Sequence, residues 1–179
     1  MNSQHYLKDT LLQLRKYKIM AEKAMAQISD DDFFTELSDI DNSLAIIVKH
    51  MAGNMRSRWR DFLTSDGEKD DRHRDTEFEI YDSDSKESLM QKWEDGWQLC
   101  FEAIELLIPE DLEKTIYIRA EAHSVLEAIN RQLTHYAYHV GQIVYLSRHF
   151  AGTNWKSLGI PKGESDSYDV SKDGKVRKE

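Results

Sequence analysis

The stretch that decides the fold is SVLEAINRQLTHYAYHVGQIVYLSRHF, residues 124–150. Its apolar residues recur every three or four positions, which is the period of an amphipathic helix. Ser124 followed by Glu127 is typical of a capping box at a helix start, and Gly152 favours a stop just beyond the stretch. The residues expected on its buried face are Val125, Leu126, Ile129, Leu133, Tyr136, Val140, Ile143 and Val144. The sequence therefore predicts a long helix with one face in a core.

Three further stretches, at about 6–28, 42–63 and 84–108, show the same period, which makes four predicted helices in all. The chain has only 8 glycines and 2 prolines, and this scarcity favours long helices over turn-rich architectures. A length of 179 residues suits one core. We therefore predict an all-α helix bundle.

The connections between these helices differ in character. Residues 64–86, TSDGEKDDRHRDTEFEIYDSDSK, form a charged connection of a length that is usually functional or mobile. Asp84 with Glu87 resembles a capping box for the third helix. TIYIRA, residues 115–120, alternates like a strand but is too short to suggest a sheet, so we expect an extended connector.

The chain is predicted to be one domain, residues 1–161, followed by a tail. The tail, residues 162–179, is KGESDSYDVSKDGKVRKE, which is polar and almost devoid of apolar residues. Such a segment cannot offset the entropy of ordering itself, so we expect it to be disordered or loosely wrapped.

Composition excludes several classes of function. The net charge of -9 and the scattered Lys and Arg residues argue against nucleic-acid binding. No apolar run approaches the roughly 20 residues needed to cross a bilayer, and the first ten residues lack an apolar signal core. A single cysteine, Cys100, excludes an intrachain disulfide and suits a reducing compartment. We therefore expect a cytoplasmic protein without membrane partners, in which Cys100 is an inert packing residue.

Three histidines suggest a metal site. His135 and His139 lie one helical turn apart, with Cβ atoms about 6 Å from each other, so both imidazoles can reach one ion. His50, in LAIIVKHMAGNMRSRW, lies at the edge of the apolar stripe of the second predicted helix, as the pair does on the fourth. Three neutral imidazoles from two helices can hold a transition metal and leave coordination positions open. The alternative is that the pair consists of ordinary, partly exposed helix histidines.

Two polar residues near these histidines have a predicted supporting role. Asn54 follows His50 by one turn, and Gln142 lies near the pair on the fourth helix. Either could orient a ligand histidine or contact a substrate, and either could equally be an ordinary polar residue. No Asp or Glu is spaced beside the pair as in an HExxH helix, so the sequence does not indicate a general base.

Several stretches of the sequence resemble the DinB/YfiT-like superfamily of proposed metalloenzymes. They resemble more closely an uncharacterised subfamily of it. The resemblance rests on IVKHMAGNMRSRW, RDTEFE, IRAEAHSV and RQLTHYAYHVGQIVYL, and it extends from the first helix to IPKG. It implies an antiparallel four-helix bundle with a long crossover between the second and third helices. It also implies a divalent metal, commonly nickel or zinc, bound by His50, His135 and His139.

The resemblance implies a metal site, but it does not imply one particular reaction. Some superfamily members transfer thiols such as bacillithiol or mycothiol, and a related branch isomerises maleylpyruvate with a thiol cofactor. A three-histidine metal can activate a thiol or a water near neutral pH. We therefore expect an enzyme that directs a low-molecular-weight thiol, or failing that a water, at a small-molecule electrophile.

The alternatives are a metal-dependent hydrolase, a non-catalytic metal-binding module related to stress, and a structural homodimer whose histidines satisfy a buried seam. Four tryptophans and eight tyrosines exceed the usual need of one small core, which favours a homodimer in any of these cases.

Overall fold

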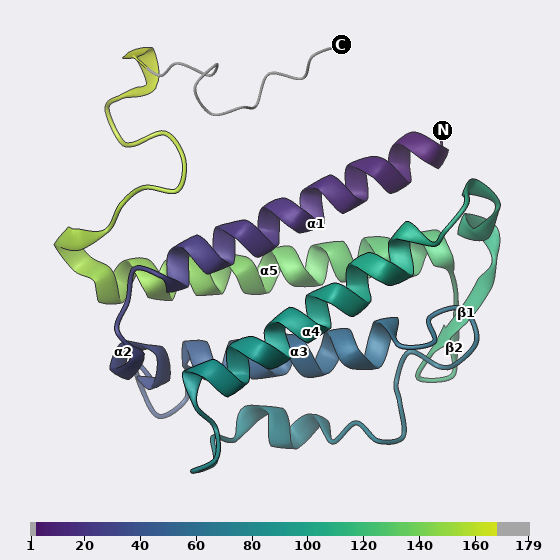
Figure 1. Cartoon of the computed structure of the whole chain (residues 1–179), viewed down its shortest axis with the longest axis horizontal. Coiled ribbons are helices and arrows are strands. Elements are labelled where there is room, and N and C mark those ends of the chain that lie inside the picture. Colours follow the sequence, from purple (N-terminus) through teal and green to yellow (C-terminus); the bar gives the residue numbers. More distant parts are fainter. Residues whose placement is uncertain (1–2, 168–179) are drawn as a thin grey trace.

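The computed structural model describes residues 3–167 of the chain. Most of these residues belong to four long helices that pack side by side in a bundle (Figure 1). The four helices are α1 (Ser3–Met25), α3 (Leu44–Trp59), α4 (Lys86–Glu105) and α5 (Val125–Ala151). The predicted all-α four-helix bundle is confirmed.

The direction of each helix explains the long connection in the middle of the chain. In Figure 1, α1 and α5 run one way, whereas α3 and α4 run the other way. Because α3 and α4 are consecutive long helices with the same direction, the chain must return along the bundle between them. Residues 60–85, here called the crossover, make that return on the outer side of α3. The long crossover implied by the resemblance is therefore present.

Side-chain caps fix where the helices begin. Ser124 accepts a hydrogen bond from the backbone N–H of Glu127, and the Glu127 carboxylate accepts one from the backbone of Ser124, so the predicted capping box is confirmed. The predicted box at the start of α4 is wrong, because Ser85 is the N-cap there. Asp84 is not free to cap, since its carboxylate accepts a hydrogen bond from Lys49 at 2.6 Å.

Several short elements were not predicted from the sequence. They are α2 (Asp30–Phe34), the 3-10 helices η1 (Arg74–Phe78), η2 (Pro109–Glu113), η3 (Gly152–Asn154) and η4 (Ser165–Ser167), and the strands β1 (Thr115–Ile118) and β2 (Glu121–Ser124). Each is five residues long or fewer, so a helical or strand period gives at most a weak signal in the sequence, as the alternation at residues 115–120 does for β1.

The two strands pair as an antiparallel hairpin, which corrects the extended connector expected at residues 115–120. The turn between them consists of Arg119 and Ala120, whose φ angles are 56° and 61°. Positive φ at both turn residues matches the twist of a hairpin but is disfavoured for residues that have a Cβ atom. The carboxylate of Asp66 accepts hydrogen bonds from both turn amides, at 2.9 and 2.8 Å, and so stabilises this conformation.

The core lies where the four long helices meet. Trp93, Trp97 and Tyr136 are fully buried there. A Cβ atom at Gly96 of α4 would lie 3.1 Å from the Cβ atom of Met55, so glycine lets α3 and α4 approach closely. Cys100 is buried in the same core, and burial raises the pKa of its thiol well above the usual range. This environment agrees with a packing role for the cysteine.

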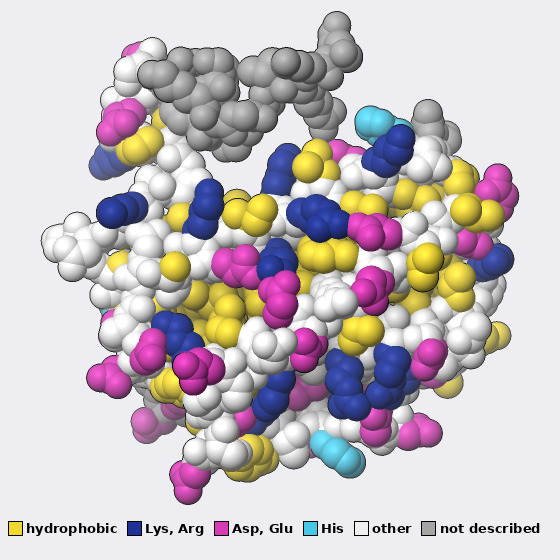
Figure 2. Space-filling view, in the orientation of Figure 1, with side chains coloured by type: hydrophobic (Ala, Val, Ile, Leu, Met, Phe, Trp, Pro, Cys, Tyr) yellow, Lys and Arg dark blue, Asp and Glu magenta, His cyan; other side chains and the backbone are white. Residues whose placement is uncertain are grey.

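Charged side chains of both signs lie on the face of the bundle shown in Figure 2. On this face, basic and acidic side chains are interspersed, with hydrophobic side chains visible between them. Lys18 of α1 forms an ion pair of 2.7 Å with Glu94 of α4. Among residues 3–167, no helix is both long and apolar enough to cross a membrane. Of the predicted tail, residues 168–179 lie outside the described part of the chain.

Candidate metal centre

The three histidines predicted as metal ligands from the sequence lie together in the structure. His50 projects from α3, and His135 and His139 project from α5. One ring nitrogen from each lies within 4.8 Å of the other two, a spacing that could hold a metal ion. The ring centroids are 4.6 to 5.7 Å apart. The three come together because each lies at the margin of a buried helical stripe, and α3 and α5 pack along those margins.

Hydrogen bonds orient two of the three rings. The Nδ1 atom of His50 lies 2.9 Å from the Glu77 carboxylate, and the Nδ1 atom of His139 lies 2.8 Å from the side-chain oxygen of Gln142. Since both oxygens can only accept, each Nδ1–H donates, and the lone pair of each neutral ring is then on Nε2. Metal-binding histidines are commonly held in this way by an acceptor on the second nitrogen.

His135 has a different environment. Its Nε2 atom lies 3.0 Å from the Nε2 atom of His139, and its Nδ1 atom is buried without a hydrogen-bond partner among the described residues. Burial, followed by the neighbouring His139 and His50, lowers the pKa of His135 to about 3. Burial likewise lowers the pKa of His139 to about 4. Both rings are therefore neutral at pH 7, which is the protonation state that binds a metal.

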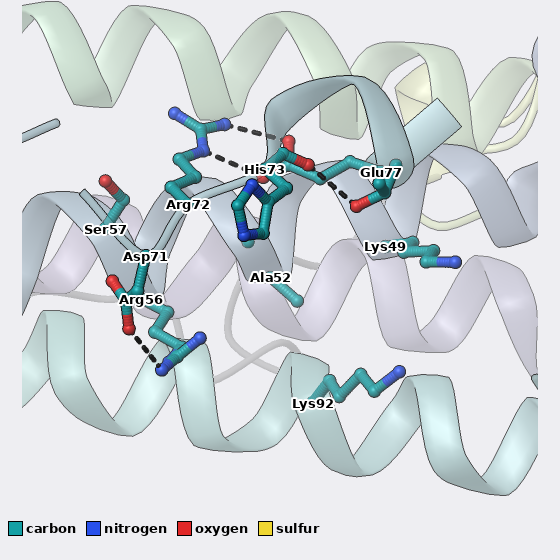
Figure 3. Close-up of a pocket in the computed structure, with 11 residues that line it drawn as sticks. Lys49, Ala52, Arg56, Ser57, Asp71, Arg72, His73, Glu77 and Lys92 are labelled. Carbon is teal, nitrogen blue, oxygen red and sulfur yellow. Dashed lines mark hydrogen bonds and ion pairs between the residues drawn. The ribbon is translucent and has the colours of Figure 1, made fainter. Parts of the chain in front are cut away.

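Glu77 reaches His50 from η1 in the crossover. Arg72 holds the Glu77 carboxylate through two hydrogen bonds of 2.8 and 2.9 Å, and these are the dashed lines between the two residues in Figure 3. Burial alone would raise the pKa of Glu77, but the hydrogen bonds from His50 and Arg72 outweigh it and lower the pKa. The carboxylate is therefore ionised and is a strong acceptor for His50.

A glycine in α3 makes this contact possible. A Cβ atom at Gly53 would lie 2.3 Å from a carboxylate oxygen of Glu77, which is far inside van der Waals contact. Figure 3 shows the crossover lying against α3 at this place, beside a cavity of about 320 Å³ whose lining includes Gly53 and Glu77. Glycine destabilises a helix at an interior position such as this one. The close approach of Glu77 explains why a glycine is nevertheless present.

The two predicted supporting residues have different surroundings. Gln142 bonds to His139, as described above. The side-chain oxygen of Asn54 instead accepts hydrogen bonds from Gln132 at 2.7 Å and from the Tyr136 hydroxyl at 3.3 Å. Asn54 lies beside the histidines but belongs to a buried polar network.

Glu77 and Arg72 were missed by the sequence analysis because the crossover has no helical period. Two features of the sequence agree with a contact between the crossover and α3, although neither identifies these two residues. The crossover is longer and more charged than an ordinary connection, and an unexplained glycine lies one turn after His50 in a helix. An acidic residue does therefore lie beside the histidines, although it comes from a segment distant from the pair in the sequence.

Fold and site together define a helical bundle with a three-histidine cluster that could hold a metal ion. The chain belongs to DUF1572, a family described as proteins of unknown function, which it matches over residues 1–164. No curated protein and no solved structure matches the chain.

Proposed function

We propose that the protein is a metal-dependent enzyme in which His50, His135 and His139 hold a divalent ion, nickel or zinc. The observation that carries this proposal is the convergence of three ring nitrogens within 4.8 Å. The acceptors on His50 and His139 support it, because they leave the lone pair of each ring on the nitrogen opposite the hydrogen bond. We further propose that the family belongs to the DinB/YfiT-like superfamily, on the order of the histidines and the crossover.

The proposed reaction is the attack of a low-molecular-weight thiol, such as bacillithiol, or of a water on a small electrophile. A divalent ion on three imidazoles with open positions supplies this chemistry by lowering the pKa of a bound thiol or water. Glu77 and Gln142 fix the tautomer and orientation of His50 and His139. Asn54 holds Gln132 in place at the wall beside the cluster.

An open pocket next to the histidines favours an enzyme over a sequestered structural metal. This cavity of about 250 Å³ is lined by His50 and His135, together with Asn54 and Gln132. A small molecule in the cavity would therefore touch the cluster directly. A non-catalytic metal-binding module would need no such access, and a hydrolase would use the same cavity with water as nucleophile.

Elemental analysis of protein purified without a metal-affinity tag tests the metal. We expect one nickel or zinc per chain in the wild type and none in a His139→Ala variant. His149→Ala is the matched control, because His149 is an exposed histidine on the same helix and should leave the metal content unchanged. Equal metal content in the His139→Ala variant, or none in the wild type, would contradict the proposal.

Assays of the metal-loaded protein with panels of thiols and electrophiles test the reaction. We expect thiol-dependent turnover that is lost in the His139→Ala variant and kept in the His149→Ala variant. Turnover of an ester or amide without any thiol would assign a hydrolase instead. A full complement of metal without any turnover would favour the non-catalytic alternative.

A further inference from the structure

The pocket beside the histidine cluster is strongly basic. Five arginines line it, namely Arg58, Arg72, Arg74, Arg119 and Arg131. They come from α3, the crossover, the hairpin turn and α5, so segments distant in the sequence meet at this one cavity. The chain as a whole carries a net charge of -9, so this concentration of positive charge is a local feature.

The carboxylates around the pocket do not neutralise these arginines. Glu68 is shared by three of them, with ion-pair distances of 3.0 Å to Arg58, 3.3 Å to Arg72 and 3.1 Å to Arg119. Glu77 is already bound to Arg72 and His50.

The two remaining arginines have weaker partners or none. Arg74 stacks on Phe78, and its nearest carboxylate is the exposed Asp75 at 3.9 Å. Among residues 3–167, no carboxylate forms an ion pair with Arg131. Three carboxylates therefore face five guanidinium groups, and the pocket has surplus positive charge.

Two side chains of the pocket wall also have unused polar atoms. Arg58 is 5% exposed, and its Nε–H has no hydrogen-bond acceptor among the described residues. The Nδ1 atom of His135 is buried and equally without a partner. Buried polar atoms without a partner are costly and rare in folded proteins, and both of these residues line the pocket.

The hairpin turn indicates that the position of Arg119 is specifically maintained. Arg119 and Ala120 adopt a backbone conformation that residues with a Cβ atom rarely adopt, and Asp66 holds them there. This turn brings Arg119 to the rim of the pocket. Strained turns of this kind persist where the surrounding structure enforces them, and they are frequent at functional sites.

We infer that the pocket binds a small dianion, carrying either two carboxylates or a phosphate group. The planar guanidinium fork of arginine matches both groups and can bind them through paired hydrogen bonds. A volume of about 250 Å³ is below the roughly 300–1,000 Å³ of pockets for drug-sized ligands, so the ligand is small. As a statement about the substrate class this rests on the proposed function, whereas binding of the anion itself does not require the metal.

Calorimetric titration with inorganic phosphate, malonate and the uncharged malonamide tests the inference. We expect phosphate or malonate to bind the wild type and malonamide not to bind. The Arg119→Gln and Arg131→Gln variants should weaken binding of the anion by about tenfold, the usual effect of losing one hydrogen bond to a charged group. Arg148→Gln is the matched control, because Arg148 is exposed on α5 and lies about 25 Å along the helix from Arg131.

The outcomes separate the anion site from the metal site. Binding that is kept in the metal-free His139→Ala variant and weakened in the Arg119→Gln and Arg131→Gln variants supports the inference, whatever the metal content. The anion that binds more tightly identifies the natural ligand as a phosphate or as a dicarboxylate. The inference is overturned if neither anion binds the wild type, if the arginine variants bind like Arg148→Gln, or if binding is lost only in the His139→Ala variant. In the last case the anion binds the metal.

Discussion

At the scale of single residues, Gly53 couples the crossover to the histidine cluster. The Glu77 carboxylate occupies the space that a side chain at position 53 would fill. Glu77 in turn orients His50 through a hydrogen bond. A methyl group at this position would overlap the carboxylate, so a substitution that normally favours a helix should here disturb the cluster.

We expect Gly53→Ala to lower the free energy of unfolding by about 1–3 kcal/mol through overpacking. It should also weaken metal binding by about 10- to 100-fold, as losses of a residue that orients a metal ligand usually do. Gly141→Ala on α5 is the control, because a Cβ atom there meets nothing within 4 Å. That change should raise stability by up to about 1 kcal/mol. Urea unfolding and metal titration measure both effects, and equal behaviour of the two variants would refute the role of Gly53.

The low pKa values of His135 and His139 predict the pH dependence of the metal-free protein. Folded-state values of about 3 and 4 lie below the ordinary 6.5 of the unfolded chain. Below pH 6.5 the unfolded chain therefore binds more protons than the folded one, and the free energy of unfolding falls as the pH drops from 6.5 towards 4. Well above pH 6.5, where the unfolded chain has also lost these protons, the two groups contribute no pH dependence.

Urea unfolding at several pH values in the presence of a chelator measures this dependence. A His135→Gln variant should show a shallower fall in stability between pH 6.5 and pH 4, because one of the two groups no longer titrates. A fall as steep as that of the wild type would show that burial of His135 does not cause it.

How far the site could be predicted from the sequence depends on periodicity. His135 and His139 share a helix, so their spacing alone places them on one face, and His50 shows the same position relative to its stripe. Glu77 lies in a segment without a repeating pattern, and nothing local places it next to His50. The arginines of the basic pocket are scattered in the sequence and meet only through the tertiary fold.

At the scale of elements, the sequence predicted the long helices and missed the short ones. Each long helix buries a continuous stripe, which is a pattern visible in the sequence. The hairpin was missed because four-residue strands give little signal and because its turn lacks the glycine or asparagine that usually marks such turns. Asp66, more than 50 residues earlier in the chain, supplies the missing stabilisation through its contacts with the turn amides.

Two substitutions at the hairpin turn should have opposite effects on the free energy of unfolding. Ala120→Gly should raise the free energy of unfolding by up to about 1 kcal/mol, because glycine adopts positive φ without a steric penalty. Asp66→Ala should lower it by about 1–3 kcal/mol, because the charged acceptor of two turn amides is lost. Thermal and urea unfolding of both variants check the signs. A destabilised Ala120→Gly variant would show that the turn is not strained.

At the scale of the whole molecule, the proposed metal would add a link between three segments that packing and hydrogen bonds already hold together. His50 lies on α3, the histidine pair lies on α5, and Glu77 adds the crossover behind His50. An ion at this junction binds the folded state and has no matching site in the unfolded chain, so it must add stability.

We expect nickel or zinc at a concentration of 100 times its dissociation constant to stabilise the protein by about 2.7 kcal/mol. The His139→Ala variant should show no such gain, whereas the His149→Ala variant should show all of it. Melting temperature as a function of metal concentration measures the effect, and a wild type that is indifferent to added metal would contradict the proposed centre.

The order of the three imidazoles along the chain also bears on biosynthesis. His50 emerges from the ribosome long before α5, which carries the other two and is the last long helix to be translated. A nascent chain that lacks α5 has a single imidazole of the trio and cannot retain a divalent cation against cellular chelators. If the protein holds a divalent cation, the complete trio therefore exists only after α5 has been made, and loading of the cation cannot precede that point.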